Sequence, residues 1–73
     1  MDKRSLSISG HRTSIALEPQ FWAALERMAA ESGQTMTGLI AAIDAERDTE
    51  NLSSAARLAV LAWYQARLDA SND

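Results

Sequence analysis

The chain has no cysteine and only one histidine, His11, and these absences exclude several ways of stabilising a small protein. Disulfides and thiolate metal sites cannot form, and neither can a site with several histidine ligands. The 73 residues make one small domain, and below roughly 70–80 residues a single core seldom supplies more than about 3–5 kcal/mol. Because 47% of the residues are hydrophobic, we expect a partner subunit to provide further burial.

Long apolar runs are also missing from the sequence. No stretch approaches the ~18 consecutive apolar residues of a membrane helix. Residues 1–10 contain basic side chains but lack the apolar segment of a secretion signal. We therefore expect a cytoplasmic protein with no membrane partner.

Positive charge is scarce, since seven Lys and Arg oppose ten Asp and Glu, for a net charge of −3. The distribution is uneven. Residues 1–12 carry three cations and one acid, or +2, whereas residues 13–73 carry four cations and nine acids, or −5. A basic terminus of this kind is either a solubilising feature or an electrostatic contact for nucleic acid. Composition alone favours the first interpretation.

No catalytic group of residues stands out. Ser14 and His11 have no recognisable orienting acid, nucleophile elbow or glycine-rich phosphate loop. So short a chain also lacks the walls of a typical substrate pocket. The acidic stretch over residues 44–50 lacks the glycine and terminal glutamate of a calcium-binding loop. We predict that the protein is not an enzyme and uses neither a cofactor nor a metal.

An alternating pattern over residues 12–17 predicts a half-buried strand. Ile15 and Leu17 share one face, and a short lone strand needs a partner at its edge. We expect that partner to be the same strand of a second copy. The outward face of the strand carries Arg12, Ser14 and Ala16.

Residues 3–9 alternate too, but with the opposite phase, since Leu6 and Ile8 occupy even positions. Gly10 is the natural place for a bulge or turn that shifts the phase. Residues 1–11 are therefore either an extra strand hinged at Gly10 or a flexible basic arm.

Three helices are expected after the strand. The first runs from Pro19 to about Ser32, because proline suits the first helical position and Gly33 suits a left-handed C-cap. The second has Thr35 as its N-cap. Gly38 within it either permits close backbone approach or is a tolerated weak spot.

The third helix is expected to begin near residues 51–54, capped by Asn51 or Ser53, and to run to about Asp69. Residues 44–51, which precede it, are interpreted as the end of the second helix and a solvated connection, and residues 70–73 should fray. The helix carries apolar residues on two sides, which indicates more than one neighbour. In so short a chain, one neighbour is expected to be a second subunit.

The order of strand, proline-initiated helix, glycine turn and Thr-capped helix resembles the ribbon-helix-helix family of bacterial DNA-binding proteins. The general match covers residues 13–22 and 32–40, and closer matches cover Lys3-Arg4-Ser5, Gly10-His11-Arg12-Thr13-Ser14, Ile43-Asp44-Ala45-Glu46-Arg47 and Asn51-Leu52-Ser53-Ser54-Ala55-Ala56-Arg57. Together they resemble a subfamily of short bacterial proteins, and the resemblance spans about residues 3–65.

The resemblance implies a mainly α fold with one or two short N-terminal strands. It also implies an intertwined homodimer with an intermolecular antiparallel β-ribbon, and residues 12–69 would form this domain with an additional third helix. The ribbon would read bases in the major groove of double-stranded DNA through Arg12, Ser14 and Ala16, with Ala16 limited to touching a thymine methyl.

Further contacts follow from the same resemblance or from the charge pattern. The N-terminus of the second helix would hold a phosphate, although the start of the third helix, residues 53–57, resembles such a site as well. The expected phosphate contacts are Lys3, Arg4, His11, Thr35, Met36 and Thr37. The expected dimer core is Ile15, Leu17, Phe21, Leu58 and Leu61.

Two functions follow as hypotheses. The first is a dimeric, sequence-specific DNA-binding protein that regulates transcription. The alternative is a dimeric protein-interaction module of the same fold that has lost DNA binding, and its partner would be another protein. The acidic composition, Ala16 and the small number of basic residues in the N-terminal arm favour the alternative.

Overall fold

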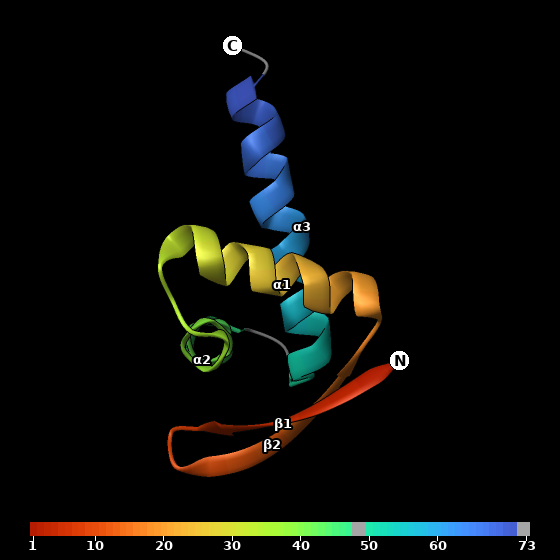
Figure 1. Ribbon diagram of the computed structural model, residues 1–73, viewed down its shortest axis with the longest axis vertical. Coiled ribbons are helices and arrows are strands. Elements are labelled where there is room, and N and C mark those ends of the chain that lie inside the picture. Colours follow the sequence, from red (N-terminus) through yellow and green to blue (C-terminus); the bar gives the residue numbers. More distant parts are fainter. Residues whose placement is uncertain (48–49, 72–73) are drawn as a thin grey trace.

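A computed structural model describes residues 1–47 and 50–71 of the chain. A hairpin of two strands is followed by three helices that lie on one side of it (Figure 1). The elements are β1 (Asp2–Ile8), β2 (His11–Leu17), α1 (Pro19–Ser32), α2 (Met36–Glu46) and α3 (Leu52–Ser71). This mainly helical fold with a short N-terminal hairpin confirms the predicted fold class.

The hairpin forms within one chain, and its strands pair antiparallel from Asp2 opposite Leu17 to Ile8 opposite His11. Ser9 and Gly10 make the turn with φ of 52° and 82°. Positive φ at both central positions is what a type I′ turn requires, and glycine adopts it without a Cβ clash. The predicted turn at Gly10 is confirmed, and the structure contains the extra strand rather than a flexible arm.

β1 of the same chain pairs with one edge of β2. The expected pairing of β2 with the same strand of a second copy concerns the other edge and stays a prediction. Ile15 and Leu17, expected in a dimer core, are buried inside the single chain. The physical reason is local, because a two-residue turn brings β1 to this edge of β2 with little loss of chain entropy. The other edge of β2 pairs with no strand among the described residues.

The predicted helix starts are confirmed by their caps. Thr35 Oγ1 accepts the N–H of Gly38 at 3.0 Å, and Asn51 Oδ1 accepts the N–H of Ser54 at 3.2 Å. A Cβ on residue 38 would lie 3.1 Å from Thr35 Oγ1. No backbone atom of another described element lies within 4 Å of that position, so Gly38 does not mark a close backbone approach between elements.

The helix ends follow the sequence with small differences. α1 ends at Gly33 in a left-handed conformation, as predicted. α2 ends at Glu46, so the charged stretch begins with the end of this helix, as predicted, and residues 48–49 lie outside the described residues. α3 continues to Ser71, past the expected end at Asp69, and residues 72–73 lie outside the described residues.

The core lies between the inner face of the hairpin and the three helices. Its fully buried large side chains are Ile15, Leu17, Trp22, Leu25 and Ile40. α3 adds Ala56 and Val60, and the indole N–H of Trp22 donates to the backbone oxygen of Asp2 at 2.8 Å. The start of β1 is thereby fixed to α1.

The first half of α3 packs on the core, and the second half projects beyond α1 (Figure 1). No helix in the described part of the chain combines the length and apolarity needed to cross a bilayer. A group of three or more side chains that could hold a metal is also absent from the described residues.

Candidate functional site

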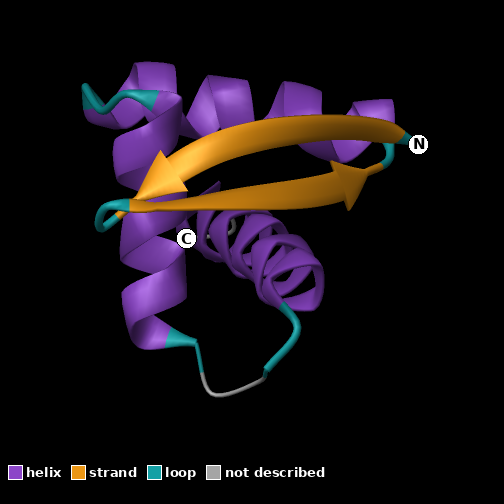
Figure 2. Cartoon of the chain, turned by 90° about the horizontal axis from the view of Figure 1, so that it is seen from below, coloured by secondary structure: helices purple, strands orange, loops and turns teal. Residues whose placement is uncertain are grey.

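The hairpin turns one face away from the helices, as seen from below in Figure 2. Side chains alternate along a strand, so the register assembles this surface from both strands. We call it the outer face, and its opposed pairs are Lys3 with Ala16, Ser5 with Ser14, and Ser7 with Arg12. All of these side chains are exposed except Ala16, which is half-buried.

The two central residues of the outer face contact each other. The hydroxyl oxygens of Ser5 and Ser14 lie 3.3 Å apart, within hydrogen-bond distance. A hydroxyl can donate one hydrogen bond and accept others, so each keeps capacity for a ligand. The middle of the outer face is therefore a small polar patch, and one cation lies toward each end.

Ion pairing separates the cations of the chain into two groups. Every arginine other than Arg12 forms an ion pair: Arg4 with Glu26, Arg27 and Arg67 with Glu31, Arg47 with Asp44, and Arg57 with Glu18. Lys3 and Arg12 make no ion pair with any described residue, and both lie on the outer face. No acidic residue occupies this face. A chain of net charge −3 thus presents a positive surface on its hairpin.

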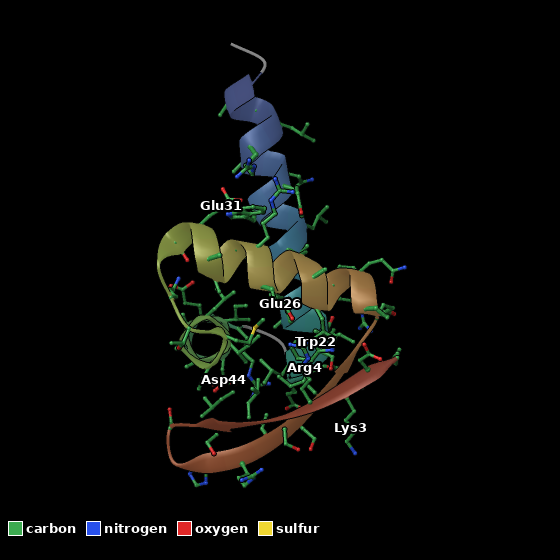
Figure 3. The ribbon with its side chains drawn as sticks, in the orientation of Figure 1. Lys3, Arg4, Trp22, Glu26, Glu31 and Asp44 are labelled. Carbon is green, nitrogen blue, oxygen red and sulfur yellow. The ribbon has the colours of Figure 1, made fainter. Side chains whose placement is uncertain are left out.

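Arg4 lies on the opposite face from Lys3, as Figure 3 shows. Its Nη2 is 2.9 Å from Glu26 Oε1, and its guanidinium lies 4.5 Å from the centre of the Trp22 ring. We expected Arg4 beside Lys3 as a phosphate contact. Neighbouring residues of a strand point to opposite faces, so the structure separates them. Arg4 instead ties β1 to α1.

The other expected phosphate contacts lie near the turn end of the hairpin. His11 is exposed just after the turn, and α2 lies over the same end (Figures 1 and 2). Thr35 and Thr37 are exposed at the start of α2, and Met36 is half-buried. The first N–H groups of a helix have no intrahelical partner. The structure thus gathers His11 and the α2 N-terminus at one end of the molecule.

The residues expected in the dimer core separate into different environments. Leu58 and Leu61 are exposed on α3. Phe21 is half-buried, and the guanidinium of Arg57 lies 5.8 Å from its ring centre. Ile15 and Leu17 are covered within the chain, so Leu58 and Leu61 are the members of this set with the most exposed side chains.

Glu18 has a role that the sequence analysis missed. Arg57 donates to it through Nε at 3.0 Å and through Nη2 at 3.2 Å, joining the end of β2 to α3. Its own backbone N–H and then Arg57 lower the pKa of the Glu18 carboxyl below its ordinary value. The two residues are 39 positions apart, so periodicity could not have paired them. The only signal was an acid placed directly before a helix-initiating proline.

A family model described as a ribbon-helix-helix domain matches residues 1–64. The chain belongs to the ribbon-helix-helix family. This domain is a regulatory DNA-binding fold rather than an enzyme fold, and family members are generally transcription regulators that usually bind DNA as dimers. No curated protein and no solved structure matches the chain.

The residues matched by the family model include the whole outer face of the hairpin. They also include the cap of α2 and most of α3, and they end before Leu68. Within the matched residues, β1 and β2 of one chain form an antiparallel hairpin. Its exposed surface combines two unpaired cations with serine hydroxyls, which suits a polyanion with hydrogen-bonding groups.

Proposed function

We propose that the protein binds double-stranded DNA as a dimer, places the outer face of its hairpin in the major groove, and regulates transcription in the bacterial cytoplasm. A two-stranded ribbon has the dimensions that the major groove admits. One observation carries the proposal. Lys3 and Arg12, the two cations without an ion pair to a described residue, both lie on the outer face.

Arg12 is assigned to base reading, because its planar fork can donate to guanine O6 and N7 together. Ser14 lies next to it on the same face and can donate to a base edge or a phosphate. Ala16 can only touch a thymine methyl. Lys3 lies opposite Ala16, where a flexible ammonium would bind the DNA backbone rather than specify a base.

The α2 N-terminus is assigned as the phosphate anchor. Backbone N–H groups and the helix dipole favour an anion there, and the flanking Thr35 and Thr37 are exposed. The start of α3 is the weaker candidate, since Ser53 and Ser54 are half-buried. His11 is assigned to the same phosphate region because it lies at the hairpin end that α2 covers (Figure 2).

A protein-interaction module remains the second candidate. The observation that favours it is the small number of cations on the outer face, together with Ala16, which offers no hydrogen bond. Binding to DNA decides between the two candidates, because a module that had lost DNA contacts would retain no duplex even at low salt.

The test is selection from random genomic duplex fragments at low and moderate salt, followed by affinity measurements. The wild type should retain a preferred sequence. Arg12→Ala should weaken binding to it by about 1–3 kcal/mol, with little loss on unrelated sequences. Arg27→Ala is the matched control, because it removes the same charge from an exposed arginine on α1 that pairs with Glu31.

Three results would change the proposal. Equal loss on every sequence would make Arg12 a phosphate contact rather than a base reader. Equal effects of Arg12→Ala and Arg27→Ala would mean that only net charge matters. Failure of the wild type to retain any duplex at low salt would contradict DNA binding and favour the interaction module.

A further inference from the structure

The first half of β1 offers the helices no apolar side chain. Asp2 and Arg4 occupy the inward positions of this half. Leu6 and Ile8, the apolar residues of the strand, lie nearer the turn. Apolar burial therefore secures β1 only near the turn. The other end, where Lys3 lies on the outer face, is the free end of a two-stranded hairpin, and such ends open at much lower free energy than the whole fold.

A polar cluster takes the place of apolar contacts at this end (Figure 3). Arg4 Nη2 lies 2.9 Å from Glu26 Oε1, and the Arg4 guanidinium lies 4.5 Å from the centre of the Trp22 ring. The indole N–H of Trp22 donates to the backbone oxygen of Asp2 at 2.8 Å. We call Arg4, Trp22 and Glu26 the β1 clamp. Trp22 is 1% exposed, so the clamp rests on a fixed part of the core.

We propose that Glu26 is a positioning residue for DNA binding, because it holds Arg4 inward and thereby keeps Lys3 on the outer face. The inference rests on the proposed function. Neighbouring side chains of a strand point to opposite faces, so the direction of Arg4 fixes that of Lys3. Glu26 lies on α1, and its carboxylate contacts Arg4 rather than any residue of the outer face. Its effect on DNA binding therefore passes through β1.

The ion pair of the clamp suits a local task rather than global stability. The side chains of Arg4 and Glu26 are 40% and 57% exposed, and exposed ion pairs add little to the free energy of unfolding. Opening of a hairpin end requires much less free energy than unfolding, so the same pair can change how often residues 2–5 separate from β2. Loss of the pair should release the Lys3 end and leave the core folded.

The charge of Glu26 makes the test sharp, because general electrostatics and positioning predict opposite results for its loss. Removing an acid from a chain of net charge −3 reduces repulsion from DNA and should strengthen binding. Loss of the clamp should weaken binding instead, because the Lys3 ammonium is no longer held toward the duplex. Glu46→Gln is the matched control, since it removes the same charge from an exposed acid of α2 that makes no ion pair with a described residue.

The measurement is affinity for the duplex selected by the wild type, over a range of salt concentrations. Glu26→Gln should bind more weakly than the wild type and lose up to about 0.9 of a unit of log–log slope per chain, as Lys3→Ala should. Adding Glu26→Gln to Lys3→Ala should weaken binding no further, because the side chain that Glu26 positions is already absent. Glu46→Gln should bind at least as well as the wild type and keep its slope.

Two binding results would overturn the inference. If Glu26→Gln binds as Glu46→Gln does, the clamp has no effect on the DNA contacts. If Glu26→Gln weakens Lys3→Ala by the same factor as it weakens the wild type, Glu26 does not act through Lys3.

Amide hydrogen exchange tests the clamp without DNA. In Glu26→Gln, the backbone amides that pair residues 2–5 with β2 should exchange faster than in the wild type, whereas those of the buried Leu25 and Ile40 should keep their rates. Unchanged exchange at residues 2–5 would overturn the inference. A wild type that retains no duplex at low salt would refute the proposed function, and exchange would then decide on its own whether Glu26 holds β1.

Discussion

At the scale of single residues, the neighbouring cations Lys3 and Arg4 of β1 have different environments. Lys3 points away from the helices, whereas Arg4 contacts Glu26 and Trp22 in the body of the molecule (Figure 3). The same division holds across the chain. Arg4, Arg57 and Arg67 pair with acids of other elements and hold those elements together, whereas Lys3 and Arg12 pair with no described acid. The sign of the net charge is therefore a poor guide to function, because ion pairing decides which charges are available.

The paired carboxylates predict an acid-sensitive fold. Hydrogen bonds lower the pKa of Glu18, chiefly from its own backbone N–H and then from Arg57, and Arg67 lowers that of Glu31. The pKa of both carboxyls is below its ordinary value in the folded state. The contribution of these carboxylates to the stability of the fold is therefore complete above about pH 4.5, and it is lost as the pH falls through the lowered pKa.

The measurement is the melting temperature of wild type and Glu18→Gln across this acidic range. The variant should melt at a lower temperature near neutral pH, and the difference should shrink as the wild-type carboxyl is protonated. Glu46→Gln is the control, because Glu46 makes no ion pair with a described residue and should leave the curve unchanged. A constant difference at all pH values would show that the ion pair with Arg57 is not its cause.

At the scale of elements, the sequence predicted the helices well and the hairpin only in part. Pro19, Gly33 and Thr35 act through local backbone chemistry, so they mark helix ends without knowledge of the fold. Residues 3–9 alternate like residues 12–17, but alternation does not reveal which strand pairs with which. The sequence therefore left open an arm or a strand, and assigned the β2 partner to a second chain.

The candidate site shows the same limit. The outward positions of β2 follow from period two, and the structure places Arg12, Ser14 and Ala16 on one face. The contribution of Ser5 and Ser7 was missed, because it depends on the hairpin register. The separation of Lys3 from Arg4 could have been predicted if residues 3–9 had been treated as a strand from the beginning.

The turn provides a test of the intrachain hairpin. Gly10 has a φ of 82° and Ser9 a φ of 52°. Gly10→Ala should destabilise the protein by about 1 kcal/mol or more, because a Cβ is strained there. Ser9→Asn should stabilise it slightly, because asparagine tolerates a left-handed conformation better than serine. Urea unfolding measures both changes. If residues 1–9 were a free arm, neither substitution would shift the midpoint.

At the scale of the whole molecule, the hairpin and the C-terminal half of α3 lie at opposite ends (Figure 1). The outer face of the hairpin lies at one end and is proposed for DNA. The second half of α3 extends toward the other end (Figure 1). The chain has 73 residues, and small domains commonly gain stability from association.

The most direct test of the central claim is the salt dependence of DNA binding for wild type, Lys3→Ala and the control Arg27→Ala. If Lys3 on the outer face neutralises a phosphate, its loss removes about 0.9 of a unit from the log–log slope per contact, or about two units for a dimer. Arg27→Ala should keep the wild-type slope, because Arg27 lies on α1 in an ion pair with Glu31. A Lys3→Ala slope equal to that of the wild type would contradict the placement of DNA on the hairpin.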